Sequence, residues 1–147
     1  MRKSNIAILP SFCILQRHIN IPMTNTIETS ISIVSLLDNE IIKIKGKPHV
    51  HIELKNMDEQ YEAFLKLTKG KPTKFLTCFG ENASISDQAR ELFSNKKRAE
   101  IKTAEALVVS QLHHKLNARF HLNFFKPDIP TKIFESEAKA IEWLEAI

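Results

Sequence analysis

The chain has 147 residues, of which 43% are hydrophobic and 26% are charged, and its 21 Lys and Arg against 17 Asp and Glu leave a formal net charge of +4. This composition is typical of one globular domain with a single core, and the chain is too short for two. Only three glycines occur, and the Gly-Lys pairs at Gly46 and Gly70 lack a glycine five residues earlier, which excludes a P-loop; motifs of the G-x-G-x-x-G and G-x-S-x-G types are also absent.

The first 30 residues differ in pattern from the rest of the chain. Two basic residues precede an apolar run, as in a signal peptide, but Pro10 interrupts the run and no small-residue cleavage site follows. No stretch reaches the ~20 apolar residues that a membrane-spanning helix needs. We predict that residues 1–30 are a disordered leader or an over-extended start and that 31–147 form the domain; a secretion signal is the alternative.

Two apolar segments joined by a polar turn open the folded part. Ile31 and Ile33 begin the first strand, residues 38–40 are typical of a turn, and residues 41–45 return as the partner strand. This pattern predicts a β-hairpin. Apolar and polar residues then alternate over 50–54, which predicts a third, half-buried strand.

A helix is predicted after this third strand. Asn56 and Glu59 have the spacing of a capping box, and apolar residues recur at helical spacing as far as Thr68. Gly70 is placed to cap the carboxyl end, and Pro72 forbids continuation of the helix.

Strands and helices alternate over the remainder of the chain. Ser84 and Asp87 bracket one helix start, and Ser136 is placed to cap the last helix. The helix from about residue 110 is predicted to bury Leu112, Leu116 and Phe120. The remaining predicted strands are 74–79, 104–109 and 130–134. The order β-β-β-α-β-α-β-α-β-α predicts a single α/β domain with a mixed sheet, in which the amino-terminal β-hairpin flanks parallel strands and helices follow the strands.

Ser84 lies where the loop of residues 80–82 meets a predicted helix start. Free backbone N–H groups and the positive end of a helix dipole suit a phosphate at such a place. The same geometry suits an ordinary N-cap, with Asp87 as the acid of a capping box. Capping is the simpler interpretation, and a phosphate acceptor stays open.

The histidines offer a metal site only as a weak alternative. His49, His51 and Glu53 stand two residues apart and share one face of the predicted strand, where they would converge on an ion. A solvated strand face is the simpler interpretation, so we predict no metal and no cofactor. The other histidines of the second half are predicted to be surface or boundary residues: His113, His114 and His121.

Large apolar residues in and after the third predicted helix exceed a single helical stripe: Leu116, Phe120, Leu122, Phe124 and Phe125. Core packing accounts for most of them. The rest are expected to line an apolar pocket, form a subunit contact or cover a strand edge. A homodimer is therefore one of the alternatives.

The excess positive charge is thin and dispersed. The densest basic run, residues 96–98, is followed at once by Glu100, and it lacks the convergent cations and aromatic platform of a nucleic-acid site. We therefore predict no nucleic-acid partner and no stable membrane insertion. Cys13 and Cys78 form no C-x-x-C motif or disulfide framework, which favours a reducing cytoplasm.

Four blocks of sequence resemble those of a known family: ISDQARE at 85–91, AEALVVS at 104–110, NFFKPDIPTKIF at 123–134 and EAKAIEWL at 137–144. From about residue 31 to its end the chain resembles the small STAS/Sec14-like proteins, which are related in fold to anti-sigma-factor antagonists (SpoIIAA-like). The resemblance implies a compact α/β domain without catalytic activity.

The same resemblance implies a place for regulation. In the better-known relatives a partner kinase phosphorylates a serine at a helix start and thereby breaks a protein complex. Residues 81–86 occupy that place here, so Ser84 or Ser86 would be the phosphate acceptor, and Glu81, Asn82 and Arg90 would contact the partner. The Asp-Ser pair and the glycine-containing helix start of the switch proteins are absent from this chain.

We predict a non-enzymatic regulatory or adaptor domain that binds an unidentified protein partner through the loop 80–86 and the adjacent helix, with phosphorylation as a further level of control. The alternative is a small apolar-ligand or lipid carrier of Sec14 type, which requires an apolar pocket of ~300–1,000 Å³. An enzyme would instead show buried ionisable residues converging in a cleft.

Overall fold

The computed structural model describes residues 25–92 and 95–147. Its six-stranded sheet is built from β1 (Thr26–Glu28), β2 (Ser32–Leu36), β3 (Ile41–Gly46), β5 (Thr73–Cys78), β7 (Lys102–Val108) and β8 (Thr131–Phe134), and a small second sheet from β4 (His51–Ile52) and β6 (Ser84–Ile85). The helices are α2 (Leu54–Thr68), α3 (Asp87–Glu91), α4 (Lys96–Ala99), α5 (Leu112–Phe125) and α6 (Glu137–Ala146).

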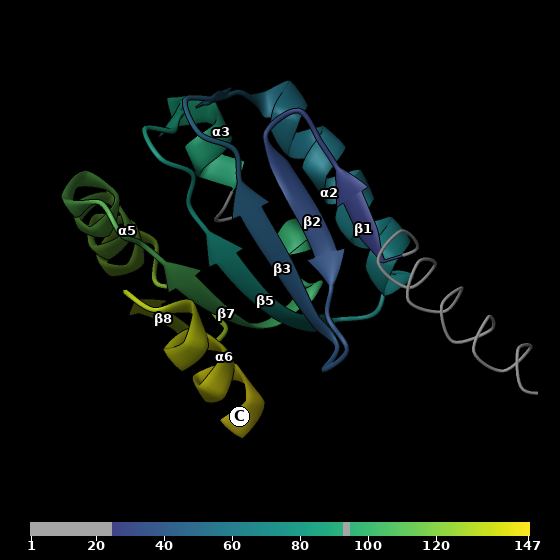
Figure 1. Cartoon of the computed structure of the whole chain (residues 1–147). Helices are drawn as coiled ribbons and strands as arrows, with labels where there is room; N and C mark the ends of the chain where they lie inside the picture. Colours follow the sequence, from purple (N-terminus) through teal and green to yellow (C-terminus); the bar gives the residue numbers. More distant parts are fainter. Residues whose placement is uncertain (1–24, 93–94) are drawn as a thin grey trace, which may run out of the picture.

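The main sheet is mixed, in the order β1-β2-β3-β5-β7-β8 (Figure 1). β1, β2 and β3 are antiparallel neighbours, whereas β3, β5, β7 and β8 pair in parallel. The predicted α/β class, the hairpin and the parallel strands beside it are therefore confirmed. Helices connect the parallel strands because a parallel pair needs a crossover connection.

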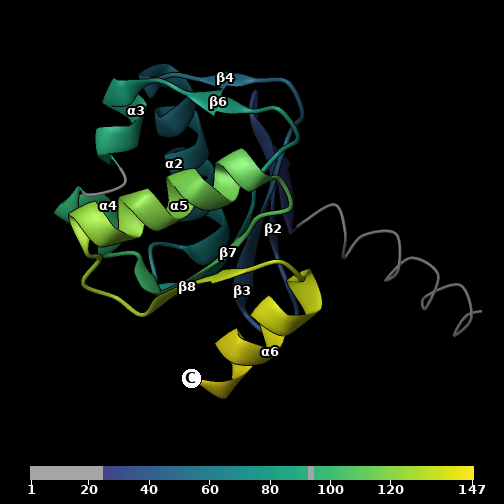
Figure 2. The same cartoon turned by 90° about the vertical axis from the view of Figure 1, so that its left-hand side faces the viewer.

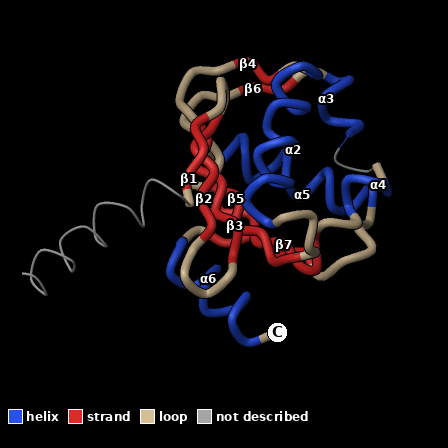
Figure 3. The backbone as a smooth tube through the Cα atoms, turned by 90° about the vertical axis from the view of Figure 1, so that its right-hand side faces the viewer, coloured by secondary structure: helices blue, strands red, loops and turns tan. Residues whose placement is uncertain are grey.

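Helices cover both faces of this sheet. Figures 2 and 3 place α2 and α5 on one side of the strands and α6 on the other. Neighbouring residues of one strand accordingly enter different cores. The core under α2 includes Val34, Ile42, Phe64 and Phe75, and the core under α6 includes Ile41, Leu76, Ala140 and Leu144. Strands buried on both faces explain the continuous apolar runs in the sequence.

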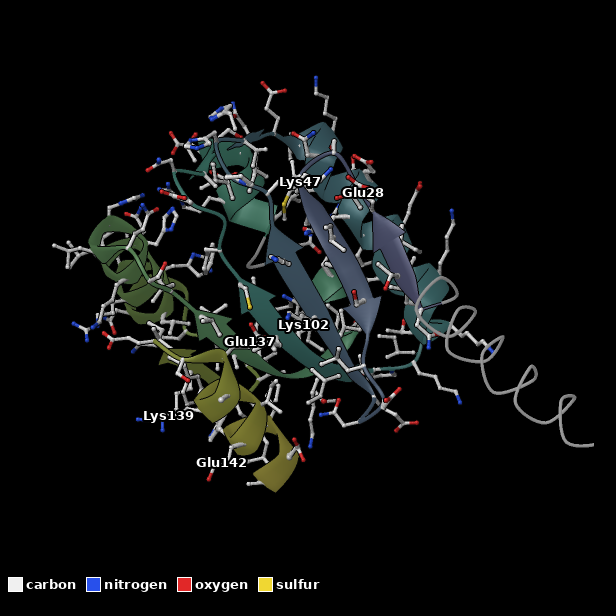
Figure 4. The ribbon with its side chains drawn as sticks, viewed as in Figure 1. Glu28, Lys47, Lys102, Glu137, Lys139 and Glu142 are labelled. Atoms are coloured by element: carbon white, nitrogen blue, oxygen red, sulfur yellow. The ribbon has the colours of Figure 1, made fainter. Side chains whose placement is uncertain are left out.

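The amino-terminal boundary of the domain lies earlier than predicted. β1 pairs with β2 and falls within residues 1–30, which were expected to be a leader. An ion pair of 2.7 Å between Lys47 Nζ and Glu28 Oε1 joins β1 to the segment after β3 (Figure 4), and the hydrogen bond from Lys47 lowers the pKa of Glu28. The rest of the predicted leader, residues 1–24, lies outside the described residues.

Two predicted boundaries around β4 are also wrong. The strand expected over 50–54 is reduced to two residues, which pair with β6 instead of joining the main sheet. α2 begins at Leu54, and its capping box joins Glu53 to Asn56, with Glu53 N donating to Asn56 Oδ1 at 2.8 Å. Asn56 and Glu59 have the same spacing as Glu53 and Asn56, so the local pattern predicts the box three residues later than it lies.

Candidate functional site

The carboxyl ends of β3, β5 and β7 meet at one edge of the sheet, where binding sites of open α/β folds commonly lie. Two glycines make this edge compact. A Cβ added to Gly80 would lie 2.2 Å from Lys47 O, and one added to Gly46 would lie 2.6 Å from Gly80 N. The loops after β3 and β5 therefore run against each other, which brings their side chains together.

We call five polar residues at this edge the carboxyl-edge cluster: His49, His51, Asn82, Ser84 and Gln111. Three of them form a chain of hydrogen bonds across three loops. Asn82 N donates to Gln111 Oε1 at 2.9 Å, Gln111 Nε2 donates to Asn82 Oδ1 at 3.3 Å, and Asn82 Nδ2 lies 3.4 Å from His49 Nδ1. The backbone joins them further, because His49 N donates to Glu81 O at 2.8 Å.

Ser84 lies in β6 and pairs with the histidine opposite it in β4. His51 Nδ1 and Ser84 Oγ are 2.8 Å apart, in register across the small sheet, and both side chains are exposed. The expected role of Ser84 as a helix N-cap is therefore wrong. Its hydroxyl is accessible at the surface beside an imidazole.

The helix cap of this region belongs to Ser86. Its side chain accepts a hydrogen bond from Ala89 N at 3.2 Å at the start of α3. Arg90 lies in the same helix with its guanidinium 3.9 Å from Asp87. Of the predicted site residues, the structure brings Asn82 and Ser84 into the carboxyl-edge cluster and Glu81 next to it through its carbonyl. Ser86 and Arg90 instead have roles within α3, as its N-cap and as the partner of Asp87.

Replacing Ser86 with alanine is expected to lower the free energy of unfolding by about 1 kcal/mol, because the cap of α3 is lost. Ser84→Ala, the matched control two residues away, removes an exposed hydroxyl and is expected to change it by less than about 0.5 kcal/mol. Urea unfolding curves of both variants check this. The reverse order of effects would contradict the assignment of the cap.

The weak metal alternative is not supported by the geometry. His49 is engaged with Asn82, His51 with Ser84, and Glu53 caps α2. Within residues 25–92 and 95–147, no group of three or more His, Cys, Asp and Glu side chains is placed to hold a metal ion. The three residues diverge because β4 ends at Ile52, so the period-2 alternation on which the hypothesis rests does not extend to them all.

α5 presents the opposite face from the one predicted. Leu112, Leu116 and Phe120 were expected to be buried, yet they are 71%, 55% and 56% exposed. His114 and Ala118, on the other side of the helix, are buried at 8% and 7% exposure. We call the three exposed residues the α5 stripe (Figure 2 shows α5 lying across the front of the molecule).

Two contacts explain this orientation of α5. Ala118 packs in a small core with Leu107 and Val109 of the β7 segment, where a short side chain lets the helix approach the sheet closely. His114 Nε2 lies 3.0 Å from Ala83 O, which satisfies a buried polar group of the loop after β5. His114 was expected at the surface or boundary and is instead part of the packing. Of the other apolar residues in question, Leu122 is half-buried, and the side chains of Phe124 and Phe125 lie outside the description.

A cavity of about 280 Å³ lies between the main sheet, α2 and the segments around α4 and residues 126–129. Its lining is mainly apolar: Ile44, Met57, Phe64, Ile101 and Ile129 contribute to it. One wall is polar, where Lys102 Nζ and Thr77 Oγ1 each donate to Glu105 Oε1 at 2.9 Å. His121 also lines the cavity, and burial lowers its pKa, against the opposite effect of Glu105.

Two parts of this arrangement were not predicted from the sequence. Glu105 was the available signal for the cavity wall, since it is the single charge in the apolar run 104–109. Gln111 carries no such signal, because its position beside Asn82 depends on the meeting of two loops distant in sequence. The thiol of Cys78 matches the expectation of a free cysteine: burial raises its pKa to about 11.

The chain was compared with curated proteins and with solved structures. No curated protein matches the chain. Among solved structures, it is similar to the crystal structure of an uncharacterised protein of the DUF3478 family from Shewanella loihica PV-4, which has a SpoIIAA-like fold. The two share 14% identity with a TM-score of 0.52, over 81% of this chain and 90% of the other.

Two further findings complete the comparison. Each helix that the structure describes is too short or too polar to cross a bilayer. The family model of a domain of unknown function, DUF7793, matches residues 35–147. The chain therefore belongs to the DUF7793 family, and its α/β domain has the STAS-like, SpoIIAA-like fold.

Proposed function

We propose that the protein is a non-enzymatic, cytoplasmic regulatory domain that binds a partner protein through the α5 stripe and the adjoining carboxyl-edge cluster. The observation that carries this proposal is the exposure of Leu112, Leu116 and Phe120 on one side of α5. Contiguous large apolar side chains at a surface commonly mark an interaction site. The packed face of α5 is formed by other residues, among them His114 and Ala118, and the stripe stays exposed beside it.

The carboxyl-edge cluster supplies the polar border of this surface. Gln111 directly precedes α5 and bonds to Asn82, so the loop 80–86 and the start of the stripe lie together. An apolar centre with a hydrogen-bonding rim is the usual composition of a protein interface. Phosphorylation of Ser84 would place a dianion in this rim, beside His51, and would change the fit of a partner. Intact mass after expression with native kinases tests this addition, and an unmodified Ser84 would exclude it.

A pull-down tests partner binding. The immobilised chain is incubated with its native lysate, and the proteins that it retains are identified by mass spectrometry. The double variant Leu116→Ser with Phe120→Ser is expected to retain at least tenfold less of the partner protein than the wild type. Leu65→Ser, which replaces a leucine exposed to 36% on α2, is the matched control and should retain it. Urea unfolding curves should show that all variants are folded under the binding conditions; Leu65→Ser is expected to lose the most stability for a single site, because Leu65 is more buried than Leu116 or Phe120. Equal retention by the double variant and the wild type would refute the proposal.

The cavity supports a second candidate, the binding of a small apolar ligand. Its volume of about 280 Å³ lies just below the ~300–1,000 Å³ range of ligand pockets, and its lining is mainly apolar. Native mass spectrometry of the purified protein would detect an added mass of a few hundred daltons if a ligand of this kind is retained. Release of that mass by Phe64→Ala but not by Leu116→Ser would locate it in the cavity.

A further inference from the structure

We infer that the α5 stripe binds an amphipathic helix of the partner whose flanks are acidic; this inference rests on the proposed function and names the chemistry of its partner. Leu112, Leu116 and Phe120 follow one another at intervals of four residues. They therefore lie on one side of α5 and span about 12 Å along its axis, or roughly two turns. A helix that carries apolar residues at spacings of three and four presents a matching stripe of this length.

The α5 residues that flank the stripe carry positive charge on one side and include no acid. At 100° per residue, Lys115 and Arg119 lie along one side of it, and His113 and Asn117 along the other. The whole of α5 contains no Asp or Glu. A partner with acidic residues beside its apolar stripe would meet these cations, whereas a basic partner would be repelled.

Glu135, an acid near this flank, is already outnumbered by cations. Glu135 forms an ion pair with Lys115, whose hydrogen bond and charge lower its pKa, and the charges of Arg119 and Lys139 lower it further. Three cations thus act on a single carboxylate. Arg119 is exposed, so positive charge remains available next to Phe120 for an acidic side chain of the partner.

Other occupants fit these observations less well. A second copy of the chain would bring the cations of two α5 helices together, and three side chains offer far less than the ~800 Å² per partner of a stable dimer. An anionic membrane would gain only about 1 kcal/mol for each cation near its surface. Membrane-binding surfaces use clusters of about 4–8 Lys or Arg, whereas α5 has two, Lys115 and Arg119.

The test uses the full chain and two labelled 16-residue helical peptides with the same leucines at i, i+3, i+7 and i+10. One peptide has glutamate at the flanking positions, and the other has lysine there. In fluorescence anisotropy the glutamate peptide is expected to bind at least tenfold more tightly, and its affinity should fall as salt is raised from 50 to about 500 mM. Phe120→Ser should weaken its binding at least tenfold.

Charge reversal provides the sharper arm. Arg119→Glu is expected to remove or invert the preference between the two peptides. Lys66→Glu, a reversal at an exposed lysine of α2, is the matched control and should leave the preference unchanged. Equal affinity for both peptides, or a preference that Arg119→Glu does not alter, would overturn the inference.

Two further measurements identify the competing occupants. Sedimentation with vesicles of phosphatidylserine and phosphatidylcholine that is lost in Phe120→Ser, without peptide binding, would overturn the inference in favour of a membrane. A dimer in light scattering that Phe120→Ser dissociates would overturn it in favour of a second copy. If the lysate partner depends on the stripe but the glutamate peptide does not bind, the partner's chemistry is wrong while the proposed function stands.

Discussion

Gly80→Ala is expected to lower the free energy of unfolding by about 3 kcal/mol or more. The added Cβ would lie 2.2 Å from Lys47 O and 2.7 Å from Lys47 C, and these are backbone atoms that a rotamer change cannot move. Relief requires the loops after β3 and β5 to separate, which also disturbs the hydrogen bond from His49 N to Glu81 O. A urea titration followed by circular dichroism measures the loss.

Gly70→Ala is the matched control for this prediction. Gly70 has a φ of +76° but nothing within 4 Å of an added Cβ, so only the backbone conformation is strained. The expected cost is about 1 kcal/mol. If the two alanine variants unfold at the same urea concentration, the close approach of the two loops is wrong, and so is the geometry of the carboxyl-edge cluster that depends on it.

Phe75→Ala is expected to lower the free energy of unfolding by about 3–5 kcal/mol. Phe75 is fully buried between the sheet and α2, where its ring meets that of Phe64 edge to face at a centroid distance of 5.0 Å. Lys102 Nζ lies 5.1 Å from the same ring, so the substitution also removes support from the polar wall of the cavity. Thermal or urea unfolding gives the change directly.

Phe79→Ala, just beyond the same strand, is the matched control. It tests whether the loss of stability at Phe75 comes from burial or only from truncating a phenylalanine. Phe79 is 37% exposed and leaves a less enclosed space when it is truncated, so a loss of about 1–2 kcal/mol is expected. Equal losses at the two positions would contradict the assignment of Phe75 to the core between α2 and the sheet.

The fold class follows from local patterns that the sequence displays directly. The apolar runs at 74–79 and 104–109 predict buried strands, and both form strands of the main sheet. Ser136 caps α6 as expected, and Pro72 follows the end of α2. These features are predictable because each depends on residues that are neighbours in the chain.

Where two residues are equally suited by spacing to cap a helix, the tertiary structure selects one of them. Ser84 and Ser86 are both plausible caps by spacing, but the pairing of Ser84 with His51 in the small sheet leaves the cap to Ser86. Glu53 rather than Asn56 is the N-cap of α2 for a similar reason, since β4 ends at Ile52. Local rules rank such candidates almost equally, and a pairing between distant segments selects one.

The amino-acid sequence by itself determined most of the strands and helices, their order and which side of each helix is apolar, whereas β1, β6 and α4 were not predicted. Only the tertiary structure decided which side of α5 faces the sheet, which loops meet at Gly46 and Gly80, and that Gln111 joins Asn82. Periodicity shows which residues share a helix face but is silent on the direction of that face. The packing of Ala118 against β7 and the hydrogen bond of His114 to Ala83 turn the apolar stripe outward, where it forms the candidate interaction surface.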